Sequence, residues 1–313
     1  MRFGIYPGGP LGTDDGTVLG STPDDPGKAL HLIDALRGDA AFHVRAYAGF
    51  TDDRDPGDTT TQAPGDALAY TTTGCRLDLV LQFQSASGDV EGYRRFVRTM
   101  IDAYGPLLDT VQVGEEANVT DNPTLDGYYP RAPEAVVAGV LAARDLVRER
   151  GLRVAVGTNT TVLFGDPGYY ARLVSTGGQE FRDALDYVGL DAFPGVFAPL
   201  PPDADSVGAC AWLLAEHRRV ALAPAGLDRL PLHITEHGWP TGPGRAEGHQ
   251  ADMLRAMVTA ALDPAAGVAS YSHFSLRDAT ADGSLFGGFG LTDVGYAPKP
   301  AFTAYAELVR AHA

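Results

Sequence analysis

The chain has 313 residues, 44% of them hydrophobic and 20% charged, a composition typical of globular proteins that excludes disordered, collagen-like and coiled-coil chains. Its 40 acidic residues against 24 basic ones give a formal net charge of −16, and such a surface repels phosphate backbones and anionic lipids. We therefore expect no nucleic acid and no membrane among its partners.

The N-terminus and the cysteines bear on where the protein works. Arg2–Tyr6 has the pattern of a strand and not the charged and apolar regions of a secretory leader. No apolar stretch approaches the roughly 20 residues that span a bilayer. Cys75 and Cys210 lie far apart and match no metal-binding spacing. We expect a cytoplasmic protein whose two cysteines are reduced.

Short aliphatic or β-branched segments alternate with Gly/Pro-rich loops and amphipathic helices along the chain. Helices with a period near 3.6 residues are predicted at Asp89–Tyr104, Ala132–Arg150 and Ala301–Ala311. Strands are predicted, in chain order, at Arg2–Tyr6, Phe42–Tyr47, Leu77–Phe83, Thr110–Val113, Arg153–Val156, Tyr187–Asp191, Pro231–Thr235 and Val268–Phe274.

Eight strands that alternate with helices over this length predict an α/β fold, a single (β/α)8 TIM barrel over residues 1–313. A doubly wound sheet is the alternative, but Gly8-Gly9-Pro10 is a poor phosphate-binding turn because proline lacks an N–H. The loops that follow strands are long, so we expect an elaborated site on the C-terminal face. These loops are Pro7–Asp25, Ala48–Asp66, Ala117–Arg131 and Ser275–Lys299.

Two carboxylates stand at the ends of the predicted fourth and seventh strands. The segment Val111–Asn118 carries Glu116, and the segment Leu232–Pro240 carries Glu236. The fourth and seventh strands of a barrel lie across its mouth, so both carboxylates can converge on one bond. Glycosidic hydrolysis needs such a pair, one group to protonate the leaving oxygen and one to attack or to activate water. The plainer alternative is a pair of solvated loop carboxylates.

These two segments resemble the motifs of the clan A retaining glycoside hydrolases, the 4/7 superfamily. Gly114-Glu-Glu-Ala-Asn118 is similar to the clan's Gly-Asn-Glu-Pro-Asn, and Thr235-Glu-His-Gly-Trp239 is similar to its Thr-Glu-x-Gly-Trp. The resemblance implies that Glu116 is the acid/base and Glu236 the nucleophile. It also implies that Arg45, on the second strand, supports the nucleophile.

The resemblance extends over nearly the whole chain. Tyr187–Pro194 looks like the clan's sixth strand, and Gly290–Ala301 looks like its closing loop. It implies hydrolysis of an equatorial, β-type glycosidic bond with retention of configuration. The expected partner is a carbohydrate or a small-molecule glycoside, and we expect no metal and no cofactor.

Three positions depart from the clan's pattern. Glu115 stands where the clan has an asparagine that binds the sugar 2-hydroxyl, and Phe193 where it has a tyrosine that donates to the nucleophile. The usual tryptophan of the eighth strand is replaced within Ser272–Ser275. Because of Glu115 and Phe193, a carbohydrate-binding pseudoenzyme on the same barrel is the second hypothesis.

Further residues are assigned to the substrate site by their chemistry. Aromatic rings stack on the apolar face of a sugar, while imidazole and amide groups bind its hydroxyls, although each of these residues can equally serve packing. Together with Arg45, Glu115 and Phe193, the predicted substrate-binding residues are Tyr6, Asn118, Asn159, His237, Trp239, His273 and Phe274.

A zinc hydrolase is the third hypothesis. His233-Ile-Thr-Glu-His237 matches the H-x-x-E-H pattern of some zinc peptidases, with Glu236 inside it. That pattern needs a helix that places both histidines on one face. Pro231 before it and Gly238-Trp-Pro240 after it leave room for no more than one helical turn. On a strand, His233 and Glu236 are expected to point to opposite faces, because their spacing is odd.

Overall fold

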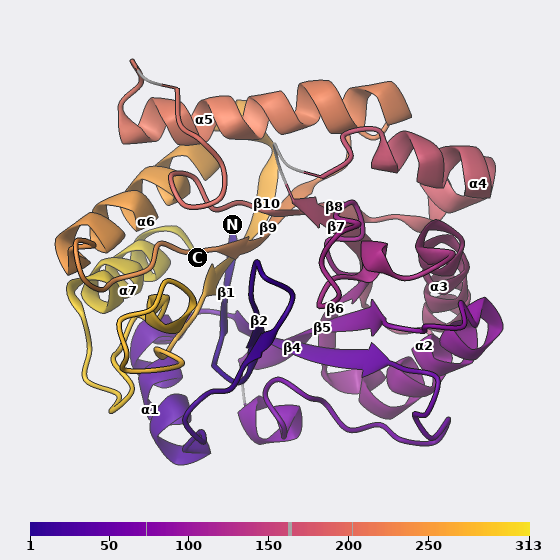
Figure 1. The fold of residues 1–313 in the computed structure, drawn as a ribbon, viewed down its shortest axis with the longest axis horizontal. Helices are drawn as coiled ribbons and strands as arrows, with labels where there is room; N and C mark the ends of the chain where they lie inside the picture. The colour runs from indigo at the N-terminus through magenta and orange to yellow at the C-terminus, as the bar shows by residue number, and fades with distance from the viewer. Residues whose placement is uncertain (73, 162–164, 202) are drawn as a thin grey trace.

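The computed structural model describes residues 1–72, 74–161, 165–201 and 203–313. Eight parallel strands close into a barrel in the order β1-β10-β9-β8-β7-β6-β5-β4, and β4 pairs with β1 (Figure 1). This confirms the predicted (β/α)8 fold. The barrel strands are β1 (Arg2–Tyr6), β4 (Phe42–Phe50), β5 (Cys75–Phe83), β6 (Leu108–Val113), β7 (Ala155–Thr161), β8 (Tyr187–Asp191), β9 (Leu232–His237) and β10 (Val268–Phe274).

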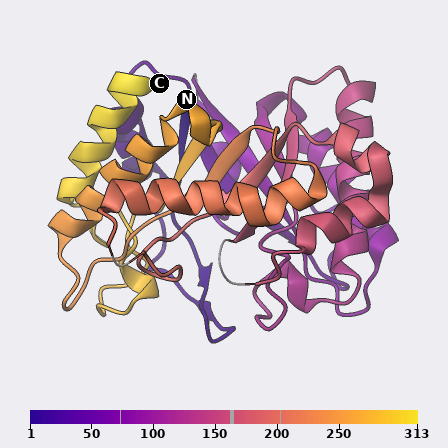
Figure 2. The same ribbon diagram turned by 90° about the horizontal axis from the view of Figure 1, so that it is seen from above.

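The helices form the outer layer around this barrel (Figure 2). Between β4 and β5, the described residues contain a short 3-10 helix, Ala67–Tyr70, and no α-helix, so the alternation is interrupted there. The three helices expected from periodicity are confirmed to within one residue at each end. The α-helices are α1 (Pro26–Arg37), α2 (Val90–Tyr104), α3 (Ala132–Glu149), α4 (Tyr169–Ala184), α5 (Ser206–His217), α6 (Glu247–Ala261) and α7 (Pro300–His312).

Several strands run further toward the site than expected. The prediction for the fifth barrel strand was wrong, since β7 begins at Ala155 and continues to Thr161. Its last four residues are polar but buried, and Asn159 and Thr161 among them hydrogen-bond to Asp191 and Asn118. β4 and β9 likewise extend to Phe50 and His237. The residues added at the ends of β7 and β9 are polar, so patterns based on hydrophobicity miss them.

Aromatic rings and imidazoles fill the barrel below the mouth. The His43 ring occupies the space where Gly4 lacks a side chain, since a Cβ there would lie 2.1 Å from the ring. In the same way, Gly157 leaves room for Tyr187, whose ring stacks on that of His233 at 3.9 Å. These closely packed rings lie inside the barrel, below the charged residues of the mouth.

The first long loop carries a hairpin of β2 (Leu11–Gly12) and β3 (Val18–Leu19), which projects from the face that bears the loops (Figure 2). It reaches the loop after β6, where Asn122 Nδ2 donates to the Thr13 carbonyl at 2.8 Å. Within the described residues we find no helix long and apolar enough to cross a bilayer. Cys75 and Cys210 are buried free thiols.

Candidate active site

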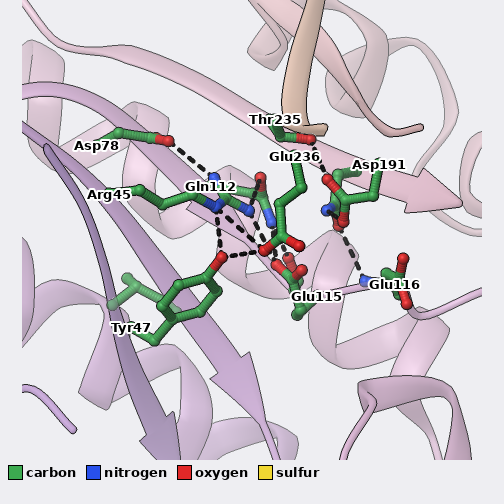
Figure 3. A network of polar contacts seen from close by, with 12 residues as sticks. Arg45, Tyr47, Asp78, Gln112, Glu115, Glu116, Asp191, Thr235 and Glu236 are labelled. Atoms are coloured by element: carbon green, nitrogen blue, oxygen red, sulfur yellow. Dashed lines mark hydrogen bonds and ion pairs between the residues drawn. The ribbon is translucent and has the colours of Figure 1, made fainter. Parts of the chain in front are cut away.

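Arg45 lies on β4 with its guanidinium completely buried inside the barrel. Its partners come from four strands and account for every guanidinium nitrogen (Figure 3). They are Asp78 Oδ2 at 2.7 Å from Nη1, Gln112 Oε1 and Glu115 Oε2 at 3.0 and 3.2 Å from Nη2, and the Tyr47 hydroxyl and Glu236 Oε1 at 2.6 and 3.5 Å from Nε. The arginine thus connects the ends of β4, β5, β6 and β9.

Glu236 stands near the end of β9, with its side chain directed toward Arg45 (Figure 3). The Tyr47 hydroxyl donates a hydrogen bond to its Oε1 and accepts one from Arg45 Nε. Tyr47 was not among the site residues predicted from the sequence. A signal was present, because residues two apart on a strand face the same side, and Arg45 was already assigned to the site.

Three carboxylates converge beside Arg45. One oxygen each from Glu115, Asp191 and Glu236 lies within 4.8 Å of the others. Asp191 accepts hydrogen bonds from Asn159 Nδ2 and Thr235 Oγ1, both at 2.6 Å. Asp191 was not among the site residues predicted from the sequence, although it is the last residue of a barrel strand.

The two glutamates that follow β6 have different environments. Glu115 is buried, accepts from Gln112 Nε2 at 2.5 Å, and donates its backbone N–H to Asp126 at 2.9 Å. Glu116 is partly exposed and has a backbone φ of 42°, a left-handed conformation that is uncommon outside glycine. Its N–H donates to Asn159 Oδ1 at 2.9 Å, so this turn places Glu116 at the edge of the cluster (Figure 3).

The charges of the cluster are unbalanced. Burial opposes ionisation of Asp78, but Arg45 and His43 outweigh it and lower the pKa of this carboxyl. Burial and then the nearby Glu115 charge raise the pKa of Glu236 to about 7, although Arg45 and the Tyr47 hydrogen bond act in the opposite direction. Arg45 is the cation that these carboxylates share.

The pKa values of Glu116 and Asp191 are raised further. Burial and the charges of Glu115 and Glu236 raise the pKa of Glu116 well above its usual value. The same three causes raise the pKa of Asp191. The site therefore retains protons on some of its carboxyls at neutral pH, and Glu116 is suited to donate one.

Three of the predicted aromatic residues, Tyr6, Phe193 and Phe274, lie in a continuous group that reaches Tyr47. Tyr6 stacks on Phe274 with centroids 4.9 Å apart and meets the Tyr47 ring edge-on at 5.4 Å. Phe193 packs edge-on against Phe274 at 6.1 Å. Trp239 is partly exposed, with its ring 4.4 Å from that of His249. The group supplies apolar surface beside a polar centre, as sugar binding requires.

The two predicted asparagines are occupied in holding the protein's own backbone. Asn118 bonds through both ends of its amide to the backbone of Thr161, at 3.1 and 3.2 Å. Asn159 joins the Glu116 backbone to the Asp191 carboxylate. Both are buried, so their prediction as direct substrate ligands is corrected to a role in orienting the loops and side chains of the site.

His237 and His273 were predicted to bind substrate, and the structure contradicts this. His237 Nδ1 lies 2.6 Å from the Tyr271 hydroxyl, and the His273 ring packs 5.7 Å from that of Tyr305 in α7. Both are buried on the outer side of the barrel wall, because successive residues of a strand face opposite sides and Glu236 points inward.

The zinc hypothesis fails because of an irregularity near the end of β9. Residues four apart on a regular strand face the same side, but the pairing of β9 with β8 shifts register between Leu190 and Asp191. The expectation that His233 and Glu236 point to opposite faces was therefore wrong, since both lie inside the barrel. His233 is inside the barrel against Tyr187, whereas His237 is outside it against Tyr271. The two imidazoles lie on opposite sides of β9 and cannot share one ion with Glu236.

No protein-family model and no curated protein matches this sequence. Among solved structures, the chain is similar to an apo beta-glucosidase named 1317, at 16% identity and a TM-score of 0.64 over 94% of this chain and 90% of that one. It is similar to the beta-glucosidase from Thermotoga maritima in complex with deoxynojirimycin, at 15% identity and a TM-score of 0.61 over 91% and 86% of the two chains. An active-site mutant of the Rhizomucor miehei beta-1,3-glucanosyltransferase in complex with laminaritriose gives 15% identity and 0.61 over 96% of each chain. At such identities the likeness shows a shared (β/α)8 fold.

Proposed function

We propose that this protein is a retaining glycoside hydrolase that cleaves an equatorial, β-type glycosidic bond. Glu236 is the nucleophile and Glu116 the general acid and base. The observation that carries the proposal is the Glu236 carboxylate at the barrel mouth, held by Arg45 and Tyr47 and close to Glu115, the residue that precedes Glu116 after β6. Active sites of this fold lie at that end of the barrel.

The first step is displacement of the leaving group. An oxygen of Glu236 attacks the anomeric carbon, while the carboxylic acid of Glu116 transfers its proton to the glycosidic oxygen, so the bond to the aglycone breaks. Arg45 and Tyr47 fix the orientation of the attacking carboxylate. The raised pKa of Glu116 supports its role as acid, since the group holds a proton before the reaction.

The second step hydrolyses the ester between the sugar and Glu236. Water attacks the anomeric carbon from the opposite face and gives its proton to the Glu116 carboxylate, so the product keeps the configuration of the substrate. Esterification removes the charge of Glu236, one of the causes that raise the pKa of Glu116. The same residue therefore becomes easier to deprotonate when it must act as a base.

The substrate is a carbohydrate or a small glycoside. The partly exposed Phe274, backed by the buried Tyr6 ring, supplies apolar surface, and the carboxylates supply acceptors for hydroxyl groups. The structural neighbours support this choice, since a beta-glucosidase is described with deoxynojirimycin and a beta-1,3-glucanosyltransferase with laminaritriose.

A panel of nitrophenyl glycosides tests the proposal, with the anomeric configuration of the first-formed product followed by NMR. We expect turnover of at least one β-glycoside with retention. An inverted product would contradict the double displacement. A wild-type protein that binds sugars but turns over none of the panel would favour the carbohydrate-binding pseudoenzyme.

A further inference from the structure

The strand that carries Arg45 also carries a hydroxyl that contacts the proposed nucleophile. Tyr47 is buried, and its phenolic oxygen accepts a hydrogen bond from Arg45 Nε at 2.6 Å while donating one to Glu236 Oε1. The Arg45 Nε itself lies 3.5 Å from the same Glu236 oxygen. One carboxylate oxygen is therefore bound from two sides by residues of a single strand.

We propose that Tyr47 is a positioning residue that keeps Glu236 ionised and aimed at the substrate, and this inference rests on the proposed hydrolase function. A hydrogen bond to the charged form of a carboxylate stabilises that form. Because the donor is neutral, it does so without adding a second cation to the site.

The contacts of Tyr47 fix the direction in which its hydroxyl points. Its backbone N–H donates to the Ala63 carbonyl at 2.9 Å, and its carbonyl accepts from Gln62 at 2.8 Å. The Arg45 guanidinium lies over its ring at 5.0 Å, and the Tyr6 ring meets it edge-on. A ring held by these contacts and at the backbone presents its donor to Glu236 at little further cost in conformational entropy.

β8, the neighbour of β9, offers no equivalent donor at its end. Phe193 follows β8, and its ring packs against Phe274 and Phe289 at 6.1 and 5.6 Å. The carboxyl of Asp191 on β8 is occupied by Asn159 and Thr235. The hydroxyl that reaches Glu236 thus comes from β4, on the other side of the barrel mouth.

The ionisable groups around Glu236 make this donor necessary. Glu115 raises the pKa of Glu236 by charge repulsion, after burial, and the Tyr47 hydrogen bond is among the few influences that lower it. Burial holds the pKa of the Tyr47 phenol well above its usual value, so the phenol keeps its proton. The groups that face or act on Glu236 are Tyr6, Arg45, Tyr47, Glu115, Glu116 and Asp191.

Tyr47→Phe removes the hydroxyl and keeps the ring. We expect the acidic limb of the kcat/KM profile, which reports Glu236, to move up by about one pH unit. At a pH below the limb this corresponds to a loss of about tenfold in kcat/KM, with a smaller change on the alkaline plateau. The matched control is Tyr170→Phe, which removes a buried hydroxyl 3.1 Å from the Gly189 carbonyl, outside the site, and leaves the limb in place.

A second variant is expected to move the acidic limb of the kcat/KM profile in the opposite direction. Placing 3-fluorotyrosine at position 47 keeps the size and the fold but makes the phenol a stronger donor, so the limb moves down. The pKa of Glu236 is also measured without catalysis, by ¹³C NMR titration of its carboxyl carbon, with Glu236→Gln used to assign the signal. It rises in Tyr47→Phe and falls with fluorotyrosine.

The outcomes separate the two proposals. An active wild-type enzyme whose limb and Glu236 titration are the same in Tyr47→Phe, or move equally in Tyr170→Phe, overturns the role of Tyr47 alone. A wild-type protein inert on glycosides overturns the hydrolase function, while the NMR titration still decides whether Tyr47 stabilises the Glu236 carboxylate. Should Tyr47→Phe not fold, the fluorotyrosine titration decides by its sign.

Discussion

The ends of β6 and β9 carry the same kind of group in different surroundings. At β9, the Glu236 carboxylate lies against Arg45 and Tyr47, which partly offset its burial and hold its pKa at about 7. After β6, Glu115 forms an ion pair with Arg45 Nη2, and Glu116 lies beyond ion-pair distance of the guanidinium. The pKa of Glu116 is accordingly raised further above its usual value.

The difference between the two strand ends shows that distance from one cation, Arg45, distinguishes Glu236 from Glu116. The carboxylate close to Arg45 is easier to ionise and is suited to attack, whereas the one at the edge keeps its proton and is suited to donate it. Glu115 strengthens the division, because its charge raises the pKa of both Glu236 and Glu116. The four predictions below test each part of this arrangement.

Glu236→Ala removes the proposed nucleophile, and we expect the largest loss, at least about 10⁴-fold in kcat on any active glycoside. The space left by the side chain can admit azide, which then attacks the anomeric carbon directly. The resulting glycosyl azide has inverted configuration, measured by NMR. Activity near that of wild type in this variant would place the nucleophile elsewhere.

Glu116→Ala removes the acid, and the loss depends on the leaving group. We expect a decrease of about 10²–10⁴-fold for poor leaving groups, and a smaller one for nitrophenyl glycosides, whose leaving group needs little protonation. The glycosyl ester accumulates on Glu236, and azide then speeds turnover and gives a product of retained configuration. If both alanine variants yield the same anomer, the two roles as assigned here are contradicted.

The fold could be predicted from the sequence because its signals are local. Each strand or helix carries its own periodicity, and eight such units in series leave few alternatives to a barrel. The strand ends were less accurate. β7 continues through Thr158–Thr161, a buried polar stretch in which Asn159 and Thr161 hydrogen-bond to residues distant in sequence.

The site could be predicted only in part, because its geometry depends on contacts between strands. Motif positions singled out Glu116, Glu236 and Arg45. The strand period places Tyr47 on the same side as Arg45, but its contact with Glu236 depends on β4 and β9 meeting in one barrel. His237 was assigned wrongly. It follows Glu236 in the same motif, but adjacent residues of a strand face opposite sides, so His237 points out of the barrel.

Glu115→Gln sharpens the comparison by removing a charge at constant size. Since Glu115 raises the pKa of Glu236, its loss lowers that pKa, and the acidic limb of the kcat/KM profile moves down from about pH 7. We expect a displacement of about one pH unit, measured on the best substrate of the panel. The amide still accepts a hydrogen bond from Arg45, so thermal unfolding serves as the control for folding. A profile that coincides with that of wild type would remove Glu115 from the electrostatics of the site.

His237→Leu tests whether His237, the residue after Glu236 on β9, contributes only to packing. Its expected effect is the smallest of the four. The variant removes the 2.6 Å partner of the Tyr271 hydroxyl, which keeps a longer contact of 3.3 Å with His273. We expect the free energy of unfolding to fall by about 1 kcal/mol, measured by urea denaturation. Because the imidazole lies outside the barrel, kcat/KM and the pH profile stay close to those of wild type. A tenfold loss of kcat/KM at unchanged stability would instead place His237 in contact with the substrate, and it would mean that β9 presents both of its last two residues to the mouth.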